Sequence, residues 1–304
     1  MNYAILNLNN IFLSLDELRA LIHGNEREYL YGVAIYEGDP KIAQKSAFIK
    51  KSGEVLSISS DVKDIIEKVR GMCFSVDLSV LMREYKSYAI PIYSEIIKNV
   101  KTSRNCEKLD LIITEGKTVI AGIRKAEKDS KSLISHSKRP YTQSGTLNPE
   151  LGRIMVNLSE SREIYDPFVG TGTILIEAKW LGLKCVGSDI DLKMLSKAKE
   201  NLKYFGYECD LFQADSRKIP IKKIESIVTD PPYGRSFSPK GLSELYEEFF
   251  YNASEHTNTL VFSTDFKFDW RDKLKEAGFK DIKIHMIYEH KSLSRAVYVV
   301  RKNV

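Results

Sequence analysis

The chain has 304 residues, of which 43% are apolar, so it can form a domain of catalytic size and a smaller accessory region around buried cores. Lys and Arg number 46 against 41 Asp and Glu, and the resulting net charge of +5 is too small to identify an anionic partner by itself. No apolar run approaches the length of a membrane-spanning helix, and the first residues lack a basic leader and a cleavage pattern. These features predict a soluble cytoplasmic protein.

Four cysteines are present, and no two of them have the short spacing of a zinc or redox motif. They are Cys73, Cys106, Cys185 and Cys209. We therefore expect reduced thiols in the core and no metal site.

The first 130 residues or so predict a mixed α+β region with antiparallel strand pairs. A helix is predicted to begin at Ser14, because Ser14 and Glu17 have the spacing of a capping box. A hairpin over residues 109–123 is predicted to turn at Glu115 and Gly116. The other predicted strands cover residues 3–8, 33–38, 46–58 and 75–80, and the other helices cover 61–69 and 88–100.

A basic stretch closes this region. Between Lys117 and Arg139, seven basic residues stand against two acidic ones, a local excess equal to the +5 of the whole chain. Such a run is either a solvated surface or a contact for an anionic partner. We interpret the polar residues 129–141 as a linker.

From residue 142 onward, strands alternate with amphipathic helices, which favours a doubly wound α/β fold with a mostly parallel sheet. A helix is predicted from Asn148 to Asn157, with Pro149 in its first turn. The predicted strands cover residues 163–166, 184–189, 210–214, 226–230 and 258–264, and an antiparallel terminal pair covers 282–290 and 295–300.

The loop after the first of these strands has the composition of a nucleoside-cofactor site. Gly170 and Gly172 lack a Cβ atom, so the backbone can come close to a ligand at the carboxyl edge of the sheet. Asp189, at the end of the next strand, supplies a carboxylate where ribose hydroxyls are normally bound. Asp215 and Ser216 follow the third strand, in a position to meet an adenine amino group.

Both a dinucleotide and S-adenosylmethionine would explain this pattern. A dinucleotide fingerprint needs a small residue three positions after Gly172, but Leu175 occupies that position. Asp166, at the entrance of the loop, would repel phosphates and attract the cationic methionine end of S-adenosylmethionine. The loop therefore favours S-adenosylmethionine.

The most specific motif is Asp230-Pro231-Pro232-Tyr233, which ends the fourth strand. An exocyclic amine on a base is a poor nucleophile because its lone pair is delocalised, and acceptors that bind its N–H groups orient that lone pair. The Asp230 carboxylate and the Pro231 carbonyl are such acceptors, and the prolines fix the turn without adding N–H donors. Tyr233 can stack on the base, a contact worth about 1–3 kcal/mol.

The donor pattern of the base edge favours guanine over adenine. An ionised Asp230 only accepts hydrogen bonds, and guanine presents its N1–H beside the N2 amino group. Adenine presents an acceptor at N1, which suits an amide side chain better. Adenine stays an alternative, because adenine-modifying enzymes with an Asp at this position exist.

With these motifs in view, residues 139–304 resemble the archaeal and eukaryotic tRNA guanine-10 N2-methyltransferases. The resemblance is carried by Arg139-Pro140-Tyr141, Gly145 to Leu151, Met155 to Leu158, Asp166 to Ala178 and Asp230 to Gly234. The chain departs from the family pattern at Val169, where Cys is common, and at Thr173, where Gly is frequent.

The resemblance implies a Rossmann-like seven-stranded methyltransferase domain over residues 142–304, after a linker at 129–141. It also implies a ferredoxin-like part at 1–57 and a THUMP-like RNA-binding domain at 58–128. Thr146 and the nearby backbone are implied to hold the cofactor. The candidate cofactor-binding residues are Thr146, Asp166, Pro167, Gly170, Thr171, Gly172, Asp189, Ile190, Asp215, Ser216 and Asp230, and the candidate catalytic residues are Asp230, Pro231, Pro232 and Tyr233.

Under this resemblance tRNA is the expected partner, and the basic stretch gains a role as a phosphate clamp. The candidate RNA-binding residues are Arg124, Lys125, Lys138, Arg139, Arg235 and Arg295. Lys240 and the turn residues His290 and Ser292 are further candidates, with an ordinary solvated surface as the alternative. Some family members need a small zinc-binding partner subunit, which makes such a subunit a candidate partner for this chain.

The expected product is N2-methylguanosine, N2,N2-dimethylguanosine or both, at guanosine 10 of tRNA. One alternative is an amine methyltransferase that acts on another guanine of tRNA or rRNA, or on adenine. A non-enzymatic alternative is an RNA-binding protein with a decayed methyltransferase domain. The intact Gly170, Gly172, Asp189, Asp230 and Tyr233 argue against the decayed domain. A NAD-linked enzyme is a third alternative.

Overall fold

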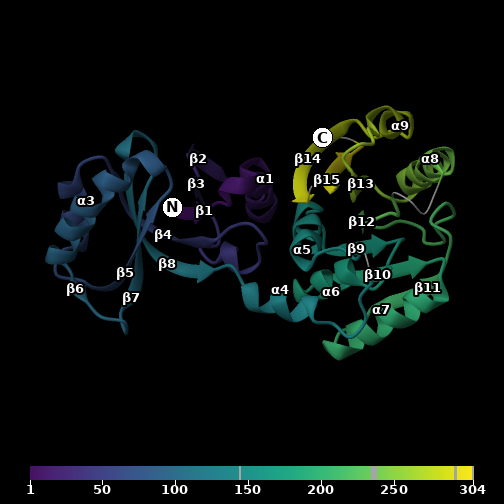
Figure 1. Ribbon diagram of the computed structural model, residues 1–304, viewed down its shortest axis with the longest axis horizontal. Helices are drawn as coiled ribbons and strands as arrows, with labels where there is room; N and C mark the ends of the chain where they lie inside the picture. The colour runs from purple at the N-terminus through teal and green to yellow at the C-terminus, as the bar shows by residue number, and fades with distance from the viewer. Residues whose placement is uncertain (144, 234–237, 291–292, 303–304) are drawn as a thin grey trace. The chain divides into compact units, whose positions relative to one another are not determined.

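The computed structural model describes every residue except 144, 234–237, 291–292 and 303–304. The chain divides into two compact units, Met1–Asp129 and Ser130–Val304 (Figure 1). Each unit has its own sheet.

The first unit contains an eight-stranded sheet in the order β2-β3-β1-β4-β8-β7-β5-β6. Its strands are β1 (Asn2–Ile5), β2 (Glu26–Leu30), β3 (Val33–Tyr36), β4 (Lys51–Ser59), β5 (Cys73–Val80), β6 (Lys101–Thr102), β7 (Glu107–Ile113) and β8 (Val119–Glu127). Its α-helices are α1 (Ile11–Ile22), α2 (Val62–Val69) and α3 (Lys86–Asn99). The predicted hairpin is present, because β7 and β8 pair antiparallel around the turn at Glu115–Lys117.

The boundary expected between residues 57 and 58 falls inside strand β4. This strand pairs with β1 on one side and with β8 on the other. The two predicted N-terminal parts therefore share one continuous sheet, and a single strand belongs to both.

The prediction of a capping box at Ser14 is wrong, because α1 already begins at Ile11. The Glu17 carboxylate binds a loop outside the helix. It accepts hydrogen bonds from the backbone N–H groups of Ala47 and Phe48 at 2.7 and 2.9 Å, and Ser14 donates to the Phe48 carbonyl. Both polar side chains are buried, and they hold the loop before β4 against the helix.

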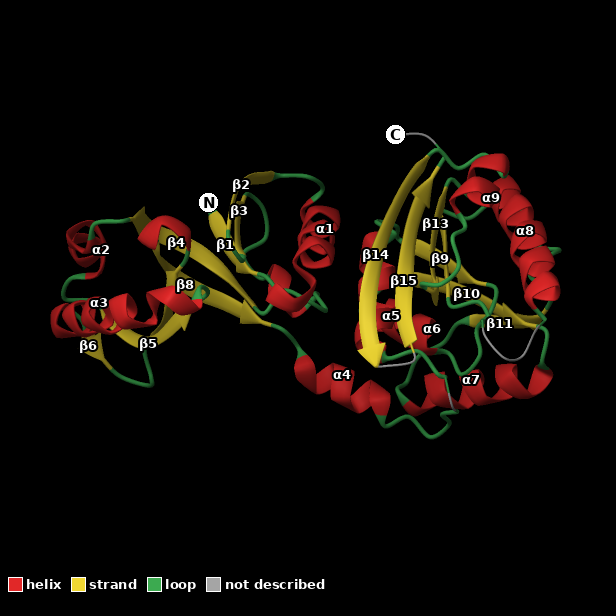
Figure 2. Ribbon diagram, turned by 45° about the horizontal axis from the view of Figure 1, so that its top comes forward, coloured by secondary structure: helices red, strands yellow, loops and turns green. Residues whose placement is uncertain are grey.

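The second unit contains a seven-stranded sheet in the order β11-β10-β9-β12-β13-β15-β14 (Figure 2). Its strands are β9 (Glu163–Asp166), β10 (Lys184–Asp189), β11 (Asp210–Gln213), β12 (Ser226–Thr229), β13 (Thr259–Asp265), β14 (Asp281–His290) and β15 (Leu293–Arg301). Strands β9 to β13 pair parallel, and β15 pairs antiparallel with both β13 and β14. The predicted Rossmann-like fold with an antiparallel terminal strand is confirmed.

Helices cover both faces of this sheet. They are α4 (Ser130–Ser137), α5 (Pro149–Leu158), α6 (Thr173–Trp180), α7 (Leu192–Tyr204), α8 (Pro239–His256) and α9 (Arg271–Glu276). Helices α8 and α9 pack an aromatic core on one face, where the Tyr246 and Trp270 rings stack with their centroids 4.2 Å apart. Because both faces are covered, β9, β12 and β13 are buried almost throughout, which is typical of parallel strands.

The predicted linker at 129–141 is largely helical, since residues 130–137 form α4. The helix belongs to the second unit, where buried His136 contacts the Glu177 carboxylate through its Nδ1 atom at 2.7 Å. Arg153 donates to the same carboxylate at 2.8 Å. The polar composition of the segment therefore reflects buried polar contacts in addition to a solvated surface.

The expectation of reduced thiols is also wrong in this structure, which pairs Cys73 with Cys106 and Cys185 with Cys209. The pairs are 33 and 24 residues apart in sequence, and the fold brings their Cα atoms to 5.7 and 5.4 Å. Within the described residues, no helix has both the length and the apolar character that crossing a membrane requires.

Candidate active site

The loop between β9 and α6 is shaped by glycines and by close packing under it. Gly172 has φ +86°, in the left-handed region that glycine adopts without strain, and it caps the N-terminus of α6. Gly187 lies under the loop, where an added Cβ would be 2.4 Å from Val169 and 2.7 Å from Leu175. The missing side chain at Gly187 thus makes room for Leu175, the bulky residue that does not fit a dinucleotide fingerprint.

Two carboxylates mark the ends of neighbouring strands β9 and β10. Asp166 is 1% exposed and accepts hydrogen bonds from the Thr229 hydroxyl at 2.6 Å and the Phe168 N–H at 3.0 Å. Burial raises the pKa of Asp166 to about 7, against the lowering effect of these donors. Asp189 accepts the Gly170 N–H at 2.9 Å, and burial raises the pKa of Asp189 as well.

Asp215 follows β11, and its surroundings differ from the sequence expectation. Its carboxylate accepts bidentate hydrogen bonds from the Arg217 guanidinium, with distances between 2.6 and 3.1 Å. These bonds lower the pKa of Asp215. An adenine amino group would therefore meet an acidic group that already has a cationic partner.

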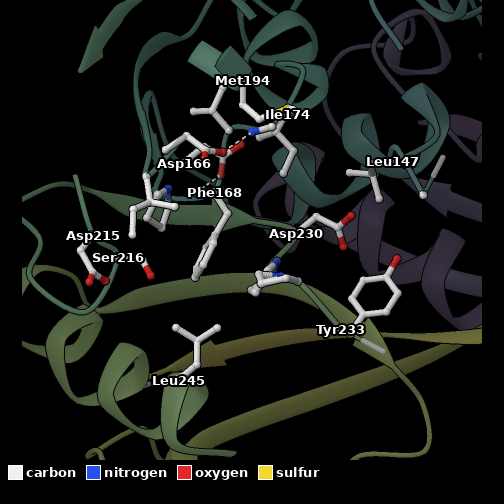
Figure 3. Close-up of a pocket in the computed structure, with 18 of the residues that line it drawn as sticks. Leu147, Asp166, Phe168, Ile174, Met194, Asp215, Ser216, Asp230, Tyr233 and Leu245 are labelled. Carbon is white, nitrogen blue, oxygen red and sulfur yellow. Dashed lines mark hydrogen bonds between the residues drawn. The ribbon is translucent and has the colours of Figure 1, made fainter. Parts of the chain in front are cut away.

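One pocket of about 740 Å³ brings the predicted residues together (Figure 3). All the candidate cofactor-binding residues except Gly172 line it, and so do Pro231, Pro232 and Tyr233. Figure 3 shows Asp230 and Tyr233 on one side and Asp215 and Ser216 on the other, with Phe168 between them. The volume is in the range of pockets that hold cofactors.

The lining of the pocket fits a cofactor with a positive charge and hydroxyl groups. Thr171 lines the pocket with a buried hydroxyl oxygen that has no hydrogen-bond partner among the described residues, so a ligand can satisfy it. Asp166 and Asp189 supply negative charge at the strand ends, which suits a cation and ribose hydroxyls better than a pyrophosphate.

Asp230 lies directly after β12 and is held from neighbouring β13 and from β15. Ser263 on β13 donates a hydrogen bond to Oδ1 of Asp230, and Nη1 of Arg295 on β15 lies 3.0 Å from the same oxygen. Burial raises the pKa of Asp230 to about 6, while Arg295 and the Ser263 hydroxyl lower it. Among the described residues, Oδ2 has a 3.4 Å contact with Arg295 alone, which makes this oxygen the better acceptor for a substrate.

Three of the predicted RNA-binding arginines are buried, which contradicts their assignment as phosphate contacts. The Arg124 side chain is 4% exposed and pairs with Asp77, Asp110 and Glu127. Arg139 is 5% exposed and donates to the His136 carbonyl and the Thr173 hydroxyl. Arg295 is 2% exposed beside Asp230.

The other candidates differ among themselves. Lys125 forms ion pairs with Glu54 and Glu107 at 3.3 and 3.2 Å, and Lys138 is exposed. Arg235, together with Gly234 of the motif and Ser292, lies outside the described residues, as do the side-chain surroundings of His290. Among the six candidates, Lys138 is the one exposed cation of the basic stretch that the structure describes.

Several pocket residues carry no sequence signal. Phe168 and Leu245 face each other across the pocket in Figure 3, and Met194 and Ile174 line it further. Leu245 comes from α8, whose amphipathic pattern predicts a helix but does not reveal which residue borders the pocket. For Arg217, the sequence offered a single signal, namely its position two residues after the predicted Asp215.

Comparison with known sequences gives one family model and close curated relatives. Residues 136–289 match the model described as RMKL-like, methyltransferase domain. A tRNA (guanine(10)-N2)-dimethyltransferase of Pyrococcus abyssi is 35% identical over 300 residues, which cover 90% of each chain. The enzyme of that name from Methanothermobacter thermautotrophicus is 36% identical over 177 residues, 54% of this chain and 52% of the relative.

Solved structures support the fold. TrmN from Thermus thermophilus matches with a TM-score of 0.55 and 18% identity, over 99% of both chains. The methyltransferase SMU.472, complexed with SAH, matches with a TM-score of 0.53 and 16% identity, over 100% of this chain and 98% of that one. At these identities the likeness concerns the fold alone.

Proposed function

The chain belongs to the family of tRNA (guanine(10)-N2)-dimethyltransferases, and from this premise we propose that it methylates the N2 amino group of guanosine 10 in tRNA. The methyl donor in this proposal is S-adenosylmethionine, and one or two methyl groups are transferred. The observation that carries the proposal is the shared pocket, in which the Asp230-Pro231-Pro232-Tyr233 turn lies beside the acidic strand ends of the cofactor region.

S-adenosylmethionine supplies, when bound, a methyl group on a positively charged sulfur. Asp166 and Asp189 are the residues proposed to hold it, through its cationic end and its ribose hydroxyls. The Thr171 hydroxyl is proposed to donate to the same ligand. When ionised, Asp166 and Asp189 favour a cationic donor over a phosphate-bearing cofactor.

The Asp230 turn is proposed to bind the base. Oδ2 of Asp230 accepts an N–H hydrogen bond from the amino group, and the Pro231 carbonyl accepts the other, which directs the nitrogen lone pair toward the donor. The bound donor would supply the methyl group and be left as a thioether, and the nitrogen would lose one proton as it gains the methyl group. Asp230 can accept this proton, because burial brings its pKa to about 6, near the working pH.

Guanine fits this turn better than adenine because its edge presents hydrogen-bond donors to the Asp230 carboxylate. The ion pair with Arg295 favours the ionised form of Asp230, and an ionised carboxylate accepts but does not donate. Guanine offers N1–H and N2–H side by side to such a group. The adenine N1 acceptor would be left facing a negative charge.

Product analysis tests the proposal. Purified chain is incubated with unmodified tRNA and labelled S-adenosylmethionine, and the labelled nucleoside is identified and located in the tRNA. We expect N2-methylguanosine or N2,N2-dimethylguanosine at position 10. Methylated adenosine, a label at another guanine, or no label would overturn the assignment.

The predicted cytoplasmic location and the small zinc-binding partner remain predictions of the sequence and the family resemblance. The same assay tests the partner, because it contains the purified chain alone. Full turnover without an added subunit would contradict a requirement for it.

A further inference from the structure

We propose that Arg295 is a positioning residue for the methyl transfer, which holds Asp230 and Tyr233 in one geometry and keeps Asp230 an acceptor. The inference rests on the proposed function and concerns a residue that the sequence assigned to RNA phosphates. Arg295 lies on β15, whereas Asp230 and Tyr233 belong to the turn after β12.

The guanidinium of Arg295 lies between two carboxylates. Its Nη1 atom is 3.0 Å from Oδ1 of Asp230, and its Nε atom is 2.8 Å from Oε1 of Glu289 on β14. The side chain is 3% exposed, so neither pair is screened well by solvent. Glu289 holds the Nε side of the guanidinium, and this contact orients the Nη1 atom toward Asp230.

The same guanidinium also lies over the ring of Tyr233, with its central carbon 4.9 Å from the ring centroid. A cation at this distance is attracted to the face of an aromatic ring. Because the guanidinium occupies one face, a base can stack only on the opposite face of Tyr233. Arg295 therefore defines both the acceptor and the stacking surface of the turn.

The charge of Asp230 depends on this contact. Asp166 and Glu289 are the carboxylates that oppose its ionisation, whereas Arg295 and the Ser263 hydroxyl favour it. Tyr233 and Tyr246 are the neighbouring phenols, and burial raises the pKa of both. Without Arg295, the pKa of Asp230 would rise from about 6, so at neutral pH more of it would be protonated.

A protonated Asp230 would be a poor partner for guanine. Its carboxyl group would offer one O–H donor to a base edge that itself presents donors. Loss of Arg295 is thus expected to lower kcat by about 10- to 100-fold, through misplacement of the amine and loss of the acceptor. The acid limb of the kcat profile is expected to move to higher pH.

The test compares R295Q and R295K with the wild type and with R301Q. Arg301 is an arginine on the same strand that pairs with Glu160 and does not line the pocket, which makes it a matched control. For each protein, kcat and the KM for tRNA are measured as a function of pH, and SAH binding is measured by calorimetry. R301Q should behave as the wild type.

We expect R295Q to have a lower kcat, with the acid limb of its kcat profile at higher pH than in the wild type. Its affinity for SAH should stay within about twofold of the wild type. R295K should recover part of the kcat. A raised KM for tRNA with an unchanged kcat profile would show a phosphate contact and overturn the inference. Loss of SAH binding in both variants would show a purely structural role and also overturn it. A wild type that methylates no guanine would overturn the proposed function and the inference together, whereas an active wild type matched by R295Q would overturn the inference alone.

Discussion

The Thr229 hydroxyl donates a 2.6 Å hydrogen bond to Oδ1 of Asp166 and so links the ends of two neighbouring parallel strands. Both residues are buried. Thr229 directly precedes Asp230, so this bond connects the acidic end of the cofactor region with the turn proposed to bind the base. The two motifs are thus coupled through one buried hydroxyl.

Replacement of Thr229 by valine tests this coupling. Valine keeps the shape but removes the donor, so the pKa of Asp166 should rise above about 7 and less of it should be ionised at neutral pH. We expect SAH to bind about tenfold more weakly, measured by calorimetry. Thr257→Val, which alters a buried hydroxyl outside the pocket, should leave the affinity unchanged. Equal affinities for both variants would count against the coupling.

The pH dependence of cofactor binding should follow Asp166. Its pKa is raised to about 7, so the carboxyl group is neutral in mild acid and gains its charge as the pH rises through neutrality. If Asp166 attracts a cationic ligand, the affinity for S-adenosylmethionine must increase over that interval. In Asp166→Asn this increase should disappear. A variant that keeps the full pH dependence would exclude Asp166 as its origin.

Gly187→Ala should destabilise the cofactor loop by overpacking. The added methyl group would lie 2.4 Å from Val169 and 2.7 Å from Leu175, too close for either side chain to stay in place. We expect a loss of about 1–3 kcal/mol in the free energy of unfolding and a weaker SAH complex. Denaturant titration against the wild type measures the stability, and calorimetry measures SAH binding. Unchanged stability would show that the loop accommodates the methyl group.

Arg124 should matter for stability, in contrast to its predicted contact with RNA. Its removal would leave the fully buried Asp110 carboxylate with Tyr3 and Lys51 as its partners in the described part of the chain. Arg124→Gln is therefore expected to destabilise the first unit by about 3 kcal/mol in denaturant titration. Arg104→Gln replaces an exposed arginine of the same unit and should change stability by less than about 0.5 kcal/mol. Equal stabilities for the two variants would contradict the buried cluster.

Local patterns were sufficient to predict the strands of the second unit and the acidic strand ends of its pocket, whereas pocket residues such as Phe168 and Leu245 carried no sequence signal. Strand ends are visible in sequence when a polar residue such as Asp166 or Asp189 follows an apolar run, and parallel strands bring their carboxyl ends to one edge. The capping box at Ser14 was wrong because Ser14 and Glu17 satisfy a distant loop instead of the helix start. The same four-residue pattern can occur at the start of a helix or in a contact with a distant loop.

The arginines were misassigned for a related reason. A positively charged residue is normally predicted to lie on the surface. Arg295 is instead buried beside Asp230, which is 65 residues away in the chain, and the sequence does not show this pairing. Arg124 is buried by carboxylates 14 and 47 residues away. Long-range ion pairs depend on sheet order, and β15 lies between β13 and β14 only in the folded chain.

The proposed function requires that the Asp230 turn present the N2 amino group of guanosine 10 to the methyl donor. The most direct measurement replaces guanosine 10 by inosine, which lacks this amino group, in an otherwise identical tRNA. We predict that the guanosine tRNA accepts methyl groups from S-adenosylmethionine and that the inosine tRNA accepts none while still binding. Methylation of the inosine tRNA at the rate of the guanosine tRNA would contradict this role of the Asp230 turn.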